Sequence, residues 1–559
     1  MSSSRRRGRA KDKKVNVYAS KCRSSQELLR ISLKDLGWKP NALLKPFECD
    51  YIWFGPPAST RLSEDEDFMQ LRETQRANRI VGMKHICNKA FMTETFNFLE
   101  RLGGGKLNLS PRSWVLPKDM DAMQQVLTVK GGFYILKPDS GSEGAGIQLA
   151  EAAQVLEKSS AMTEALRQTG KSGNVVVQRY IATPHLFSGG LKYDMRLYVL
   201  VTSIVPLQVY ICKEGLVRFC TREYCAPSKD NMDDTTMHLT NYTLNRKSER
   251  FVQGPTRLTA GSKAGMNEGS FENATKRPLS VFLSQLKEER DDFSEASFWE
   301  TIRRAVVITL ASMRPRLVLA HKNTFSSSSK RRSGESRSSF HILGVDVLLD
   351  DTLQPWLIEM NTNPSMLLSA AGTNHLRSAV DIDVKRAMLV GALSIVEDER
   401  HAERPETVTD HTGLYLKACS GDTEEDIPIG EDPKGRMVYL LDTYSQLWLC
   451  FQRMSILDTS RSVGCAVRSD TICKLMRDMP AILSDLYGSD HMPSPKSVYA
   501  AVGLLERRGL YSPFQFCDAF LRVAAVLWPN VDHGEQPPRI TLGVRVKCMV
   551  EAAAILFRF

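Results

Sequence analysis

The stretch Gly344–Pro364, GVDVLLDDTLQPWLIEMNTNP, consists of two largely apolar runs separated by one polar turn. The run VDVLL precedes the turn at residues 350–352 and the run PWLIEM follows it, a pattern typical of a β-hairpin. Such a hairpin brings the side chains of Asp346, Glu359 and Asn361 together. Mg²⁺ prefers oxygen ligands of these types together with substrate phosphates. The stretch therefore predicts either a magnesium site or, equally well, a buried hairpin with incidental acids.

Composition indicates a globular protein. The 559 residues are 42% hydrophobic and 25% charged, which suits roughly two to four domains. No apolar run approaches the roughly 20 residues of a membrane-spanning helix. The basic segment 1–14 lacks the apolar stretch of a signal peptide, so we expect a disordered arm in a cytosolic protein. The 12 cysteines form no C-x-x-C pair, which favours reduced thiols.

A net charge of +10 indicates an acidic partner. Nucleic acid, an anionic membrane and an acidic protein tail all fit that charge. A nucleic-acid binder is disfavoured because no basic stripe interleaved with aromatic residues stands out.

A glycine-rich turn follows an apolar strand in the segment FYILKPDSGSEGAGIQL, residues 133–149. Gly141, Gly144 and Gly146 let backbone amides approach an anion closely, and Lys137 at the end of the strand supplies a point charge for phosphate. The pattern indicates a phosphate-binding hairpin. A flexible surface hairpin remains the alternative.

Charged residues alternate with apolar ones in LKYDMRLYVLVTS, residues 191–203. Period-two alternation places Lys192, Asp194 and Arg196 on one face of this strand. Three charges on one face are costly unless they are paired or used, so the strand belongs either to a site or to a structural salt-bridge ladder. The next predicted strands are LQVYIC and GLVRFC, the latter carrying Arg218. The polar segment MHLTNYTLN after them is typical of an irregular binding loop.

The motifs KPDSGSEGAGI, VVQRYI, LKYDMRLYVLVTS, EGLVRF, MHLTNYTLN and FHILGVDVLLDDTLQPWLIEMNTNPS occur in this order. Together they closely resemble the tubulin tyrosine ligase-like family over about residues 15–396, and MHLTNY and VLVTS are more similar to its polyglutamylase branch. The resemblance implies an α/β (α+β) ATP-grasp fold that holds ATP between two lobes. It also implies a reaction in which ATP and Mg²⁺ activate a carboxylate as an acyl phosphate, which the amine of a free amino acid then attacks.

The resemblance also assigns residue roles. Lys89 and Lys137 resemble phosphate-contacting lysines, and Glu143 and Gly144 lie in the loop that closes over the nucleotide. The other implied nucleotide contacts are Gln178, Arg179, Tyr180, Ile181, Lys192, Asp194, Thr240 and Asn241. Those implied at the amino acid and the acyl phosphate are Arg196, Arg218, Tyr242, Thr243 and Lys276. The implied magnesium ligands are Asp346, Glu359 and Asn361, with no general-base task. The expected catalytic set is Lys137, Arg196, Arg218 and Glu359.

Three positions depart from the family pattern. The family usually has Arg-Lys where this chain has Asn88-Lys89, Phe-Pro-Gly where it has Ile80-Val81-Gly82, and lysine where it has Arg246. None of these changes removes an implied metal ligand. They bear on substrate preference more than on catalysis.

We expect five regions along the chain. They are a disordered basic arm (1–14), an N-terminal α/β lobe (15–130), central and C-terminal ATP-grasp lobes (131–400) with a disordered insertion (322–339), a linker (401–435) and a helical C-terminal domain (436–559).

The expected function is that of an ATP-dependent tubulin polyglutamylase, which ligates free L-glutamate to side-chain carboxylates of the acidic tubulin tail. We expect a monomer in the cytoplasm, on the cytoskeleton and at the cilium, flagellum or basal body, without nucleic-acid or membrane partners. The alternatives are ligation of glycine or tyrosine, modification of an acidic non-tubulin protein, and a non-catalytic microtubule-binding scaffold.

Overall fold

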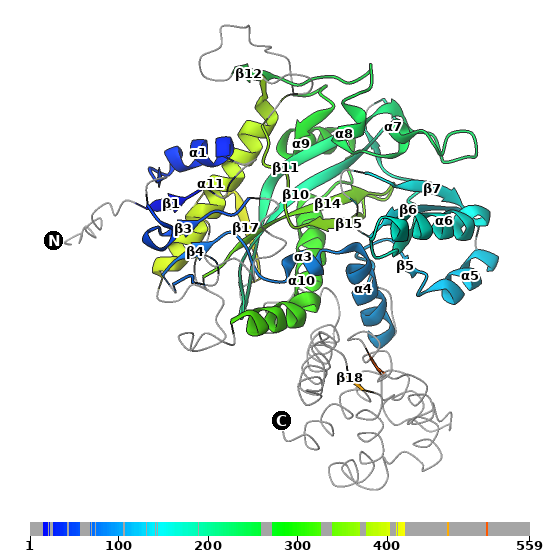
Figure 1. Cartoon of the computed structure of the whole chain (residues 1–559). Helices are drawn as coiled ribbons and strands as arrows, with labels where there is room; N and C mark the ends of the chain where they lie inside the picture. The colour runs from blue at the N-terminus through cyan, green and yellow to red at the C-terminus, as the bar shows by residue number, and fades with distance from the viewer. Residues whose placement is uncertain are drawn as a thin grey trace, which may run out of the picture.

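The computed structural model describes most of the first three quarters of the chain (Figure 1). The described residues are 15–419, except 21, 23–25, 42–43, 56–67, 69, 73, 104–106, 130, 140, 142–143, 188, 259–270, 326–337, 369, 371–375, 403–407, 409 and 411. After residue 419 they are 467–468 and 510–511. The basic arm therefore lies outside the described residues.

An antiparallel sheet of seven strands forms the centre of the molecule, in the order β13-β11-β10-β14-β15, with β17 added to β11 and β9 added to β10. Its two longest strands, β10 (Leu191–Ile204) and β11 (Leu207–Glu223), form an antiparallel pair. The other strands are β9 (Leu186–Phe187), β13 (Lys276–Pro278), β14 (His341–Leu349), β15 (Pro355–Asn361) and β17 (Tyr415–Cys419).

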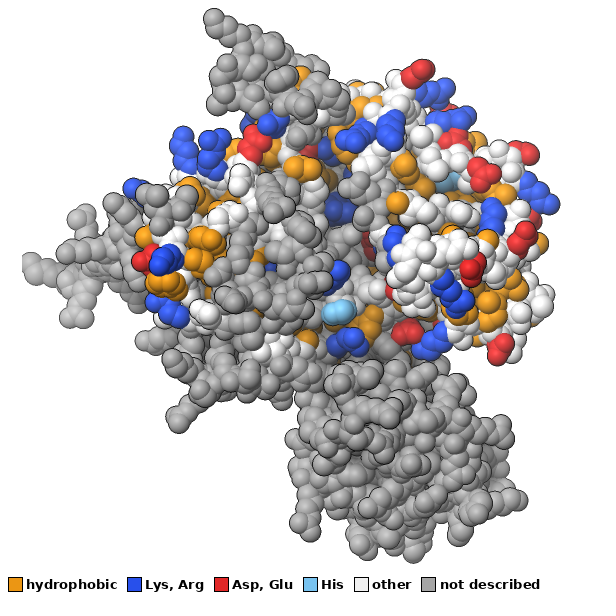
Figure 2. Space-filling view, viewed as in Figure 1, with side chains coloured by type: hydrophobic (Ala, Val, Ile, Leu, Met, Phe, Trp, Pro, Cys, Tyr) orange, Lys and Arg blue, Asp and Glu red, His pale blue; other side chains and the backbone are white. Residues whose placement is uncertain are grey.

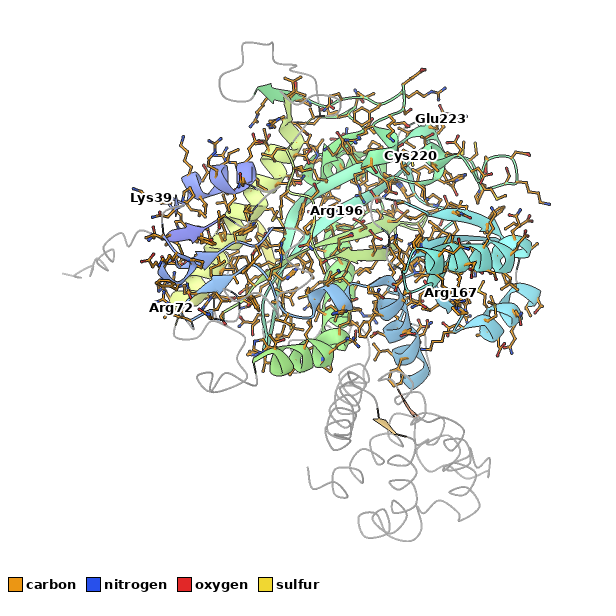
Figure 3. The ribbon with its side chains drawn as sticks, in the orientation of Figure 1. Lys39, Arg72, Arg167, Arg196, Cys220 and Glu223 are labelled. Atoms are coloured by element: carbon orange, nitrogen blue, oxygen red, sulfur yellow. The ribbon has the colours of Figure 1, made fainter. Side chains whose placement is uncertain are left out.

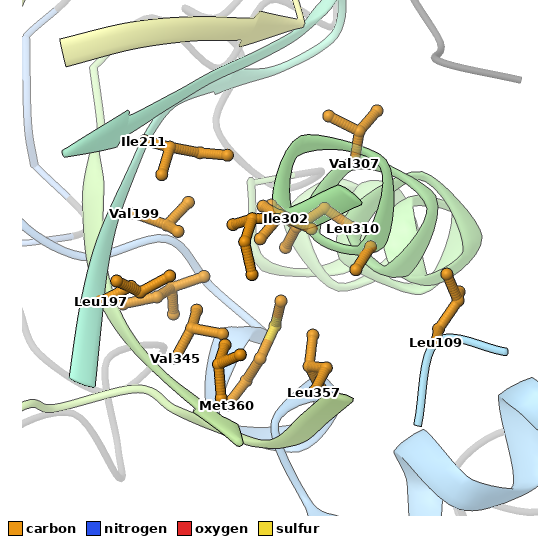
Figure 4. Packing of buried hydrophobic residues seen from close by; sticks show 14 of the residues in the cluster. Leu109, Leu197, Val199, Ile211, Ile302, Val307, Leu310, Val345, Leu357 and Met360 are labelled. Atoms are coloured by element: carbon orange, nitrogen blue, oxygen red, sulfur yellow. The ribbon is translucent and has the colours of Figure 1, made fainter. Parts of the chain in front are cut away.

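Helices cover both faces of this sheet because its strands alternate apolar residues on each side. One face packs against α9 (Leu279–Glu289) and α10 (Glu295–Phe325) through residues such as Leu197, Val345 and Ile302 (Figure 4). The other face packs Tyr198 and Leu200 against α1 (Gln26–Asp35) and α11 (Ala379–His401). The sheet is thus the middle of three layers.

Two smaller sheets flank the central one. The sheet β5-β8-β6-β7 is antiparallel, and it packs on α5 (Met120–Val129) and α6 (Val155–Gln168). Its strands are β5 (Ser113–Leu116), β6 (Phe133–Pro138), β7 (Gln148–Glu151) and β8 (Val175–Arg179). The parallel sheet β2-β1-β3-β4 lies at the opposite side of the molecule, beside α1 and α11 (Figure 1).

The remaining elements are the strands of the parallel sheet and the segments that join the sheets. The parallel sheet consists of β1 (Asn16–Tyr18), β2 (Lys39–Pro40), β3 (Tyr51–Ile52) and β4 (Arg76–Ala77). Helices α3 (Met83–Ile86) and α4 (Lys89–Gly103) lead from it to β5. Two single turns, α7 (Thr235–His238) and α8 (Tyr242–Asn245), follow β11, and β12 (Thr256–Leu258) pairs with β16 (Leu376–Ser378).

The hairpin predicted from Gly344–Pro364 is present as β14 and β15. Asp350 stabilises its turn: Oδ1 accepts the backbone N–H groups of Thr352 and Gln354, each at 3.0 Å, and Oδ2 accepts the indole N–H of Trp356 at 2.8 Å. The register places Asp346 directly opposite Glu359 and Gly344 opposite Asn361, with an irregularity beside Val347.

The structure corrects several expectations about elements. The segments LQVYIC and GLVRFC belong to the single strand β11 and are not two strands. The segment MHLTNYTLN is not wholly irregular, since it contains the end of α7 and all of α8. Helix α10, which lies against the central sheet, was not predicted from the sequence.

Three of the expected regions contain described elements. At the two ends of the insertion expected at 322–339, α10 continues to Phe325 and the carbonyl of Ser338 accepts the backbone N–H of Ala77 at 2.9 Å. Within the expected linker 401–435, β17 extends the central sheet. In the expected helical domain 436–559, the described residues form the antiparallel strands β18 (Val467–Arg468) and β19 (Leu510–Tyr511), and the rest lies outside the description.

None of the helices in the described ranges is long and apolar enough to span a membrane.

Candidate active site

A cleft of about 900 Å³, open to solvent, lies between the β5–β8 sheet and the central sheet. One wall comes from β6, the glycine-rich loop and the end of β8. The opposite wall comes from β10, β11, β14 and β15, and the segment between α7 and α8 closes one end. The predicted residues that line the cleft are Lys89, Lys137, Gly144, Gln178, Arg179, Tyr180, Ile181, Lys192, Asp194, Arg218, Thr240, Asn241, Asp346 and Glu359.

Two lysines enter the cleft beside the glycine-rich loop. Lys137, at the end of β6, is buried and donates to Gln178 Oε1 at 2.7 Å. Lys89, at the start of α4, donates to the carbonyl of Gly141 at 3.0 Å and lies 3.5 Å from Glu359 Oε2. Burial, together with the nearby Lys89 charge, lowers the pKa of Lys137 to about 8, against the opposing pull of Glu359. The pair can therefore face an anionic polyphosphate.

A third lysine, Lys192 on β10, is part of a buried hydrogen-bond network. Its ammonium donates to the Tyr180 hydroxyl at 2.8 Å and to the carbonyl of His238 at 2.9 Å. Tyr180 Oη lies 3.0 Å from His238 Nδ1, and His238 Nε2 lies 3.1 Å from the carbonyl of Asn231. This pattern fits a neutral imidazole, in agreement with a pKa of His238 that burial and Lys192 lower. The network holds the α7 segment against the end of β8.

A row of alternating charges crosses the central sheet. Arg218 donates to Asp194 Oδ1 at 2.8 Å, and its Nη2 lies 3.1 Å from Asp346 Oδ1. Arg196 donates to Asp346 through two N–H groups, at 2.5 and 3.0 Å. The row exists because antiparallel pairing sets Asp194 opposite Arg218 and Arg196 opposite Asp346. Arg196 lies near the centre of the molecule (Figure 3).

The two arginines control the charge on Asp346. Burial raises the pKa of this carboxyl group, but the guanidinium groups of Arg196 and Arg218 outweigh burial and hold the pKa well below its usual range. Asp346 is therefore ionised at neutral pH.

Asp346, Glu359 and Asn361 together can form a site for a cation. Asn361 Nδ2 lies 3.4 Å from Asp346 Oδ2 and 3.1 Å from Glu359 Oε1, so one amide bridges the two carboxylates. Reversing the Asn361 amide would present its oxygen in place of the NH₂ group, and two carboxylates with an amide oxygen are a hard-ligand set that suits Mg²⁺ bound together with phosphate oxygens. The donor set fits that ion, and Lys89 and Lys137 lie on the side from which phosphates would approach.

The glycine-rich loop contacts the α8 segment. Gly144 has φ +83°, and a Cβ atom added there would lie 3.1 Å from the side chain of Asn241. Glycine therefore serves two purposes here, a left-handed backbone and close approach to Asn241.

Five predicted residues lie beside the cleft lining. Arg196 and Asn361 contact Asp346, and Tyr242 and Thr243 belong to α8. Lys276 of β13 lies opposite Arg218 of β11 in the strand register. Glu143 lies outside the described residues.

Much of the cleft lining was not predicted from the sequence. The missed residues include Pro111, Ile135, Ile147, His238, Leu239, Leu348 and Ile358. Most are apolar residues on predicted strands, which carry no signal that separates a cleft wall from a core. His238 and Leu239 are exceptions, because both lie inside the MHLTNY motif.

A second, smaller cavity of about 510 Å³ lies behind this cleft, between α4 and β5. Lys89, Lys137 and Gln178 line both spaces. The hydrogen bond from Lys137 to Gln178 therefore lies on the boundary between them.

Buried lysines opposite a pair of carboxylates form the kind of cleft that binds a nucleotide polyphosphate with a divalent cation. The family model of the tubulin-tyrosine ligase family matches residues 68–384, which is more than half of the chain. The chain belongs to the tubulin-tyrosine ligase family.

Among its relatives, tubulin polyglutamylase TTLL11 of Mus musculus is 33% identical over 405 residues, covering 70% of this chain and 50% of the relative. Tubulin polyglutamylase TTLL6 of Mus musculus is 32% identical over 359 residues, covering 63% and 38% respectively. Tubulin polyglutamylase ttll6 of Danio rerio is 33% identical over 329 residues, covering 59% and 36%. The chain thus spans half or less of the length of these relatives.

Proposed function

We propose that this chain is an ATP-dependent tubulin polyglutamylase with an ATP-grasp fold. It ligates free L-glutamate to side-chain carboxylates of acidic tubulin tails. The observation that carries the proposal is the row of alternating charges Asp194, Arg218, Asp346 and Arg196, with Glu359 opposite Asp346, which borders a cleft containing buried lysines. Relatives named tubulin polyglutamylase support the choice of substrate.

The proposed role of each residue follows from its position in the cleft. Lys89 and Lys137 hold the phosphates of ATP, and the neighbouring loop at Gly144 closes over them. Asp346, Glu359 and Asn361 hold Mg²⁺, which supplies charge neutralisation for phosphoryl transfer when it is bound. The end of β8 and the segment at Thr240 and Asn241 line the rest of the nucleotide. The proposed contacts there are Gln178, Arg179, Tyr180, Ile181, Lys192 and Asp194.

Arg196 and Arg218 serve the reacting groups. A tail carboxylate and a γ-phosphate are both anions, so bringing them together requires nearby fixed cations. Transfer of the phosphoryl group to the carboxylate gives an acyl phosphate and ADP. The amine of glutamate then attacks the acyl carbon and releases phosphate, forming the isopeptide bond. Tyr242, Thr243 and Lys276 contact the incoming amino acid.

A cytoskeletal, cytoplasmic location follows from a tubulin substrate, and we extend the proposal to cilia, flagella or basal bodies. A monomer suffices for this chemistry, since every proposed contact comes from one chain. The net charge of +10 suits an acidic tail.

The test is incubation of purified protein with microtubules, ATP, Mg²⁺ and labelled glutamate, glycine or tyrosine in parallel. We expect incorporation of glutamate. Incorporation of glycine or tyrosine alone would reassign the amino acid, and labelling of an acidic non-tubulin protein in place of tubulin would reassign the acceptor. Binding to microtubules with no incorporation of any amino acid would identify a non-catalytic scaffold.

A further inference from the structure

A buried serine outside the cleft contacts residues that form the wall of the cleft. Ser113, the first residue of β5, lines the second cavity but not the cleft. The strand register places it directly opposite Gln178 of β8. Gln178 lies opposite Ile135 of β6, so Lys137 lies diagonally from Gln178 on the same face of the sheet. Side chains from three neighbouring strands therefore meet at the wall between the two spaces.

The hydrogen bonds among these side chains fix the orientation of one amide group. Ser113 Oγ donates to the carbonyl of Pro111 at 2.7 Å and accepts from Gln178 Nε2 at 3.0 Å. Gln178 Oε1 accepts from the Lys137 ammonium at 2.7 Å. Because a hydroxyl group has one proton and Ser113 gives it to Pro111, the Ser113 oxygen can only accept from Gln178. The amide is thus held with its oxygen toward Lys137.

Other partners of the Gln178 amide lie farther away. Ser110 Oγ is 3.4 Å and the carbonyl oxygen of Pro111 is 3.5 Å from Gln178 Nε2, and contacts of this length are weak hydrogen bonds. Ser113 therefore supplies the principal constraint on the amide. Within the described part of the chain, Gln178 Oε1 is also the one hydrogen-bond acceptor of the Lys137 ammonium. The position of Lys137 consequently depends on the orientation of this amide.

The second cavity gives these side chains room to move. Lys137 and Gln178 line both the cleft and the second cavity, so space lies on either side of their hydrogen bond. A Gln178 amide turned by half a rotation would point its NH₂ group at the ammonium, and two donors that face each other form no hydrogen bond. Lys137 would then lose its acceptor and could withdraw from the cleft.

We propose that Ser113 is a positioning residue for nucleotide binding: its hydroxyl group orients the Gln178 amide, which holds the Lys137 ammonium where it faces the phosphates of ATP. This inference rests on the proposed function. Ser113 acts through Gln178, since it does not line the cleft. Loss of the hydroxyl group should therefore weaken binding of the phosphates and leave binding of the nucleoside unchanged.

The principal test is calorimetric titration of two variants with ATP and with adenosine. Ser113→Val removes the hydroxyl group, and Ser113→Thr keeps it in a side chain of nearly the same size. Both residues suit a strand, and the second cavity beside Ser113 has room for a methyl group. Ser113→Val should bind ATP about fivefold more weakly and adenosine within about twofold of wild type. Ser113→Thr should match wild type for both ligands.

Ser113→Ala provides a second route if Ser113→Val does not fold, and it should show the same selective loss of ATP affinity. Ser159→Ala is the matched control. Ser159 is a buried serine on α6, which packs on the same sheet, and it donates to the carbonyl of Leu156 at 3.0 Å. Its loss also removes a buried hydroxyl group, but affinities for ATP and adenosine should both stay within about twofold of wild type.

Two results would overturn the role of Ser113. Equal weakening of ATP and adenosine binding in Ser113→Val and Ser113→Ala would show that the serine only supports the fold of β5. Unchanged ATP affinity in both variants would show that the Gln178 amide keeps its orientation without the hydroxyl group.

Ligation kinetics separate this inference from the proposed function. In Ser113→Val, KM for ATP should rise about fivefold while KM for glutamate stays within about twofold. If wild type binds ATP and the Val and Thr variants differ as expected, but no amino acid is ligated, the ligase function is refuted and the role of Ser113 stands. If wild type ligates glutamate and Ser113→Val binds ATP as well as Ser113→Thr does, the role of Ser113 is refuted and the ligase function stands.

Discussion

The two carboxylates at the proposed magnesium site have different partners. Asp346 accepts from Arg196 and Arg218, which fix its orientation and its charge. Glu359 Oε2 lies 3.5 Å from Lys89 Nζ, and Glu359 Oε1 lies 3.1 Å from Asn361 Nδ2. Glu359 is thus held by longer contacts than Asp346. Glu359 is therefore the carboxylate that can turn toward a cation, while Asp346 links that cation to the arginines.

Glu359→Gln should abolish ligation, by at least about a hundredfold in kcat, because an amide supplies one neutral oxygen in place of a carboxylate. Microtubule binding should remain nearly intact. Asp351→Asn, an exposed change in the turn of the same hairpin, is the control and should retain activity. Labelled glutamate incorporation measures the first effect and co-sedimentation the second. A Glu359→Gln enzyme with most of its activity would remove Glu359 from the metal site.

The pH dependence of nucleotide binding follows from Lys137. Its pKa is lowered to about 8, chiefly by burial, so the ammonium form that attracts phosphate predominates below pH 8 and is lost above it. Affinity for a fluorescent ATP analogue should fall roughly tenfold between pH 7 and pH 9. Lys137→Met should bind weakly at pH 7 and lose most of this dependence. Lys192, whose pKa burial also lowers to about 8, accounts for any remainder. A flat profile in wild type would contradict the assignment.

Sequence alternation was sufficient to identify the charged face of β10, because a regular strand sends Lys192, Asp194 and Arg196 to one side. It was not sufficient for β15. Leu357 and Met360 both enter the core although they are three residues apart, because the pairing with β14 is irregular between them. Strict alternation from Leu357 would have turned Glu359 into the core. Ser113 carries no local signal, since its partner Gln178 is 65 residues away.

His341, at the start of β14, joins that strand to two distant segments. Its Nδ1 accepts the backbone N–H of Ile80 at 3.1 Å and its Nε2 donates to the carbonyl of Thr362 at 2.8 Å. Only the neutral imidazole can make both bonds. Burial and the charge of Arg79 lower the pKa of His341 to about 3. The hairpin therefore depends on a histidine that must stay neutral.

The acid stability of the protein should reflect this histidine. A pKa lowered on folding gives stability that is complete above the unfolded value of about 6.5 and is lost progressively as pH falls toward about 3. Acidification from pH 7.5 to pH 5 should cost about 2 kcal/mol through His341. His341→Phe should lower the unfolding free energy at pH 7.5 and show a smaller loss on acidification, whereas exposed His401→Gln should match wild type. Urea denaturation at both pH values measures the difference, and equal losses in all three proteins would exclude His341.

Alanine substitutions at two glycines, one in the glycine-rich loop and one outside it, separate the effect of backbone strain from that of contact with Asn241. Gly144 and Gly170 both have positive φ, at +83° and +73°, but an added Cβ would crowd Asn241 at Gly144 and meet open space at Gly170. Both alanine variants should lose about 1–2 kcal/mol of stability from the backbone. Only Gly144→Ala should also raise KM for ATP, by roughly fivefold to tenfold. Parallel changes in KM for both variants would mean that the loop does not act through Asn241.

Hairpins and edge strands were predictable because their signals are local, as in β6, β7, β14 and β15. Helix α10 was not, because it buries side chains on several sides, among them Phe298, Val307, Leu310 and Met313, and Pro315 lies within it. Such a helix lacks the single apolar stripe that marks a surface helix. The strand β17 was also hidden, since it follows a polar segment and finds its partner β11 about two hundred residues earlier.

Buried charges border the cleft, and other charged side chains lie on the surface. The two groups should affect different steps, the buried charges catalysis and the surface charges association with a partner. The buried carboxylates Asp194 and Asp346 are paired with arginines on neighbouring strands. On the visible face of the described part, Lys and Arg side chains are distributed broadly, with acidic side chains between them (Figure 2). Surface charges are screened by salt, whereas buried pairs are screened much less. The net charge of +10 should therefore act on binding to an acidic filament and hardly at all on chemistry in the cleft.

Raising NaCl from about 50 to about 200 mM should weaken microtubule binding on the order of tenfold, because it shortens the range of attraction between a basic protein and acidic tails. KM for ATP should change by less than about twofold over the same range. Microtubules whose acidic tails have been removed by proteolysis are the control, and binding to them should be weak at both salt concentrations. Co-sedimentation measures the affinity. Salt-independent binding, or equal binding to intact and tail-less microtubules, would place the contact on the filament body and would assign the net charge no role in substrate capture.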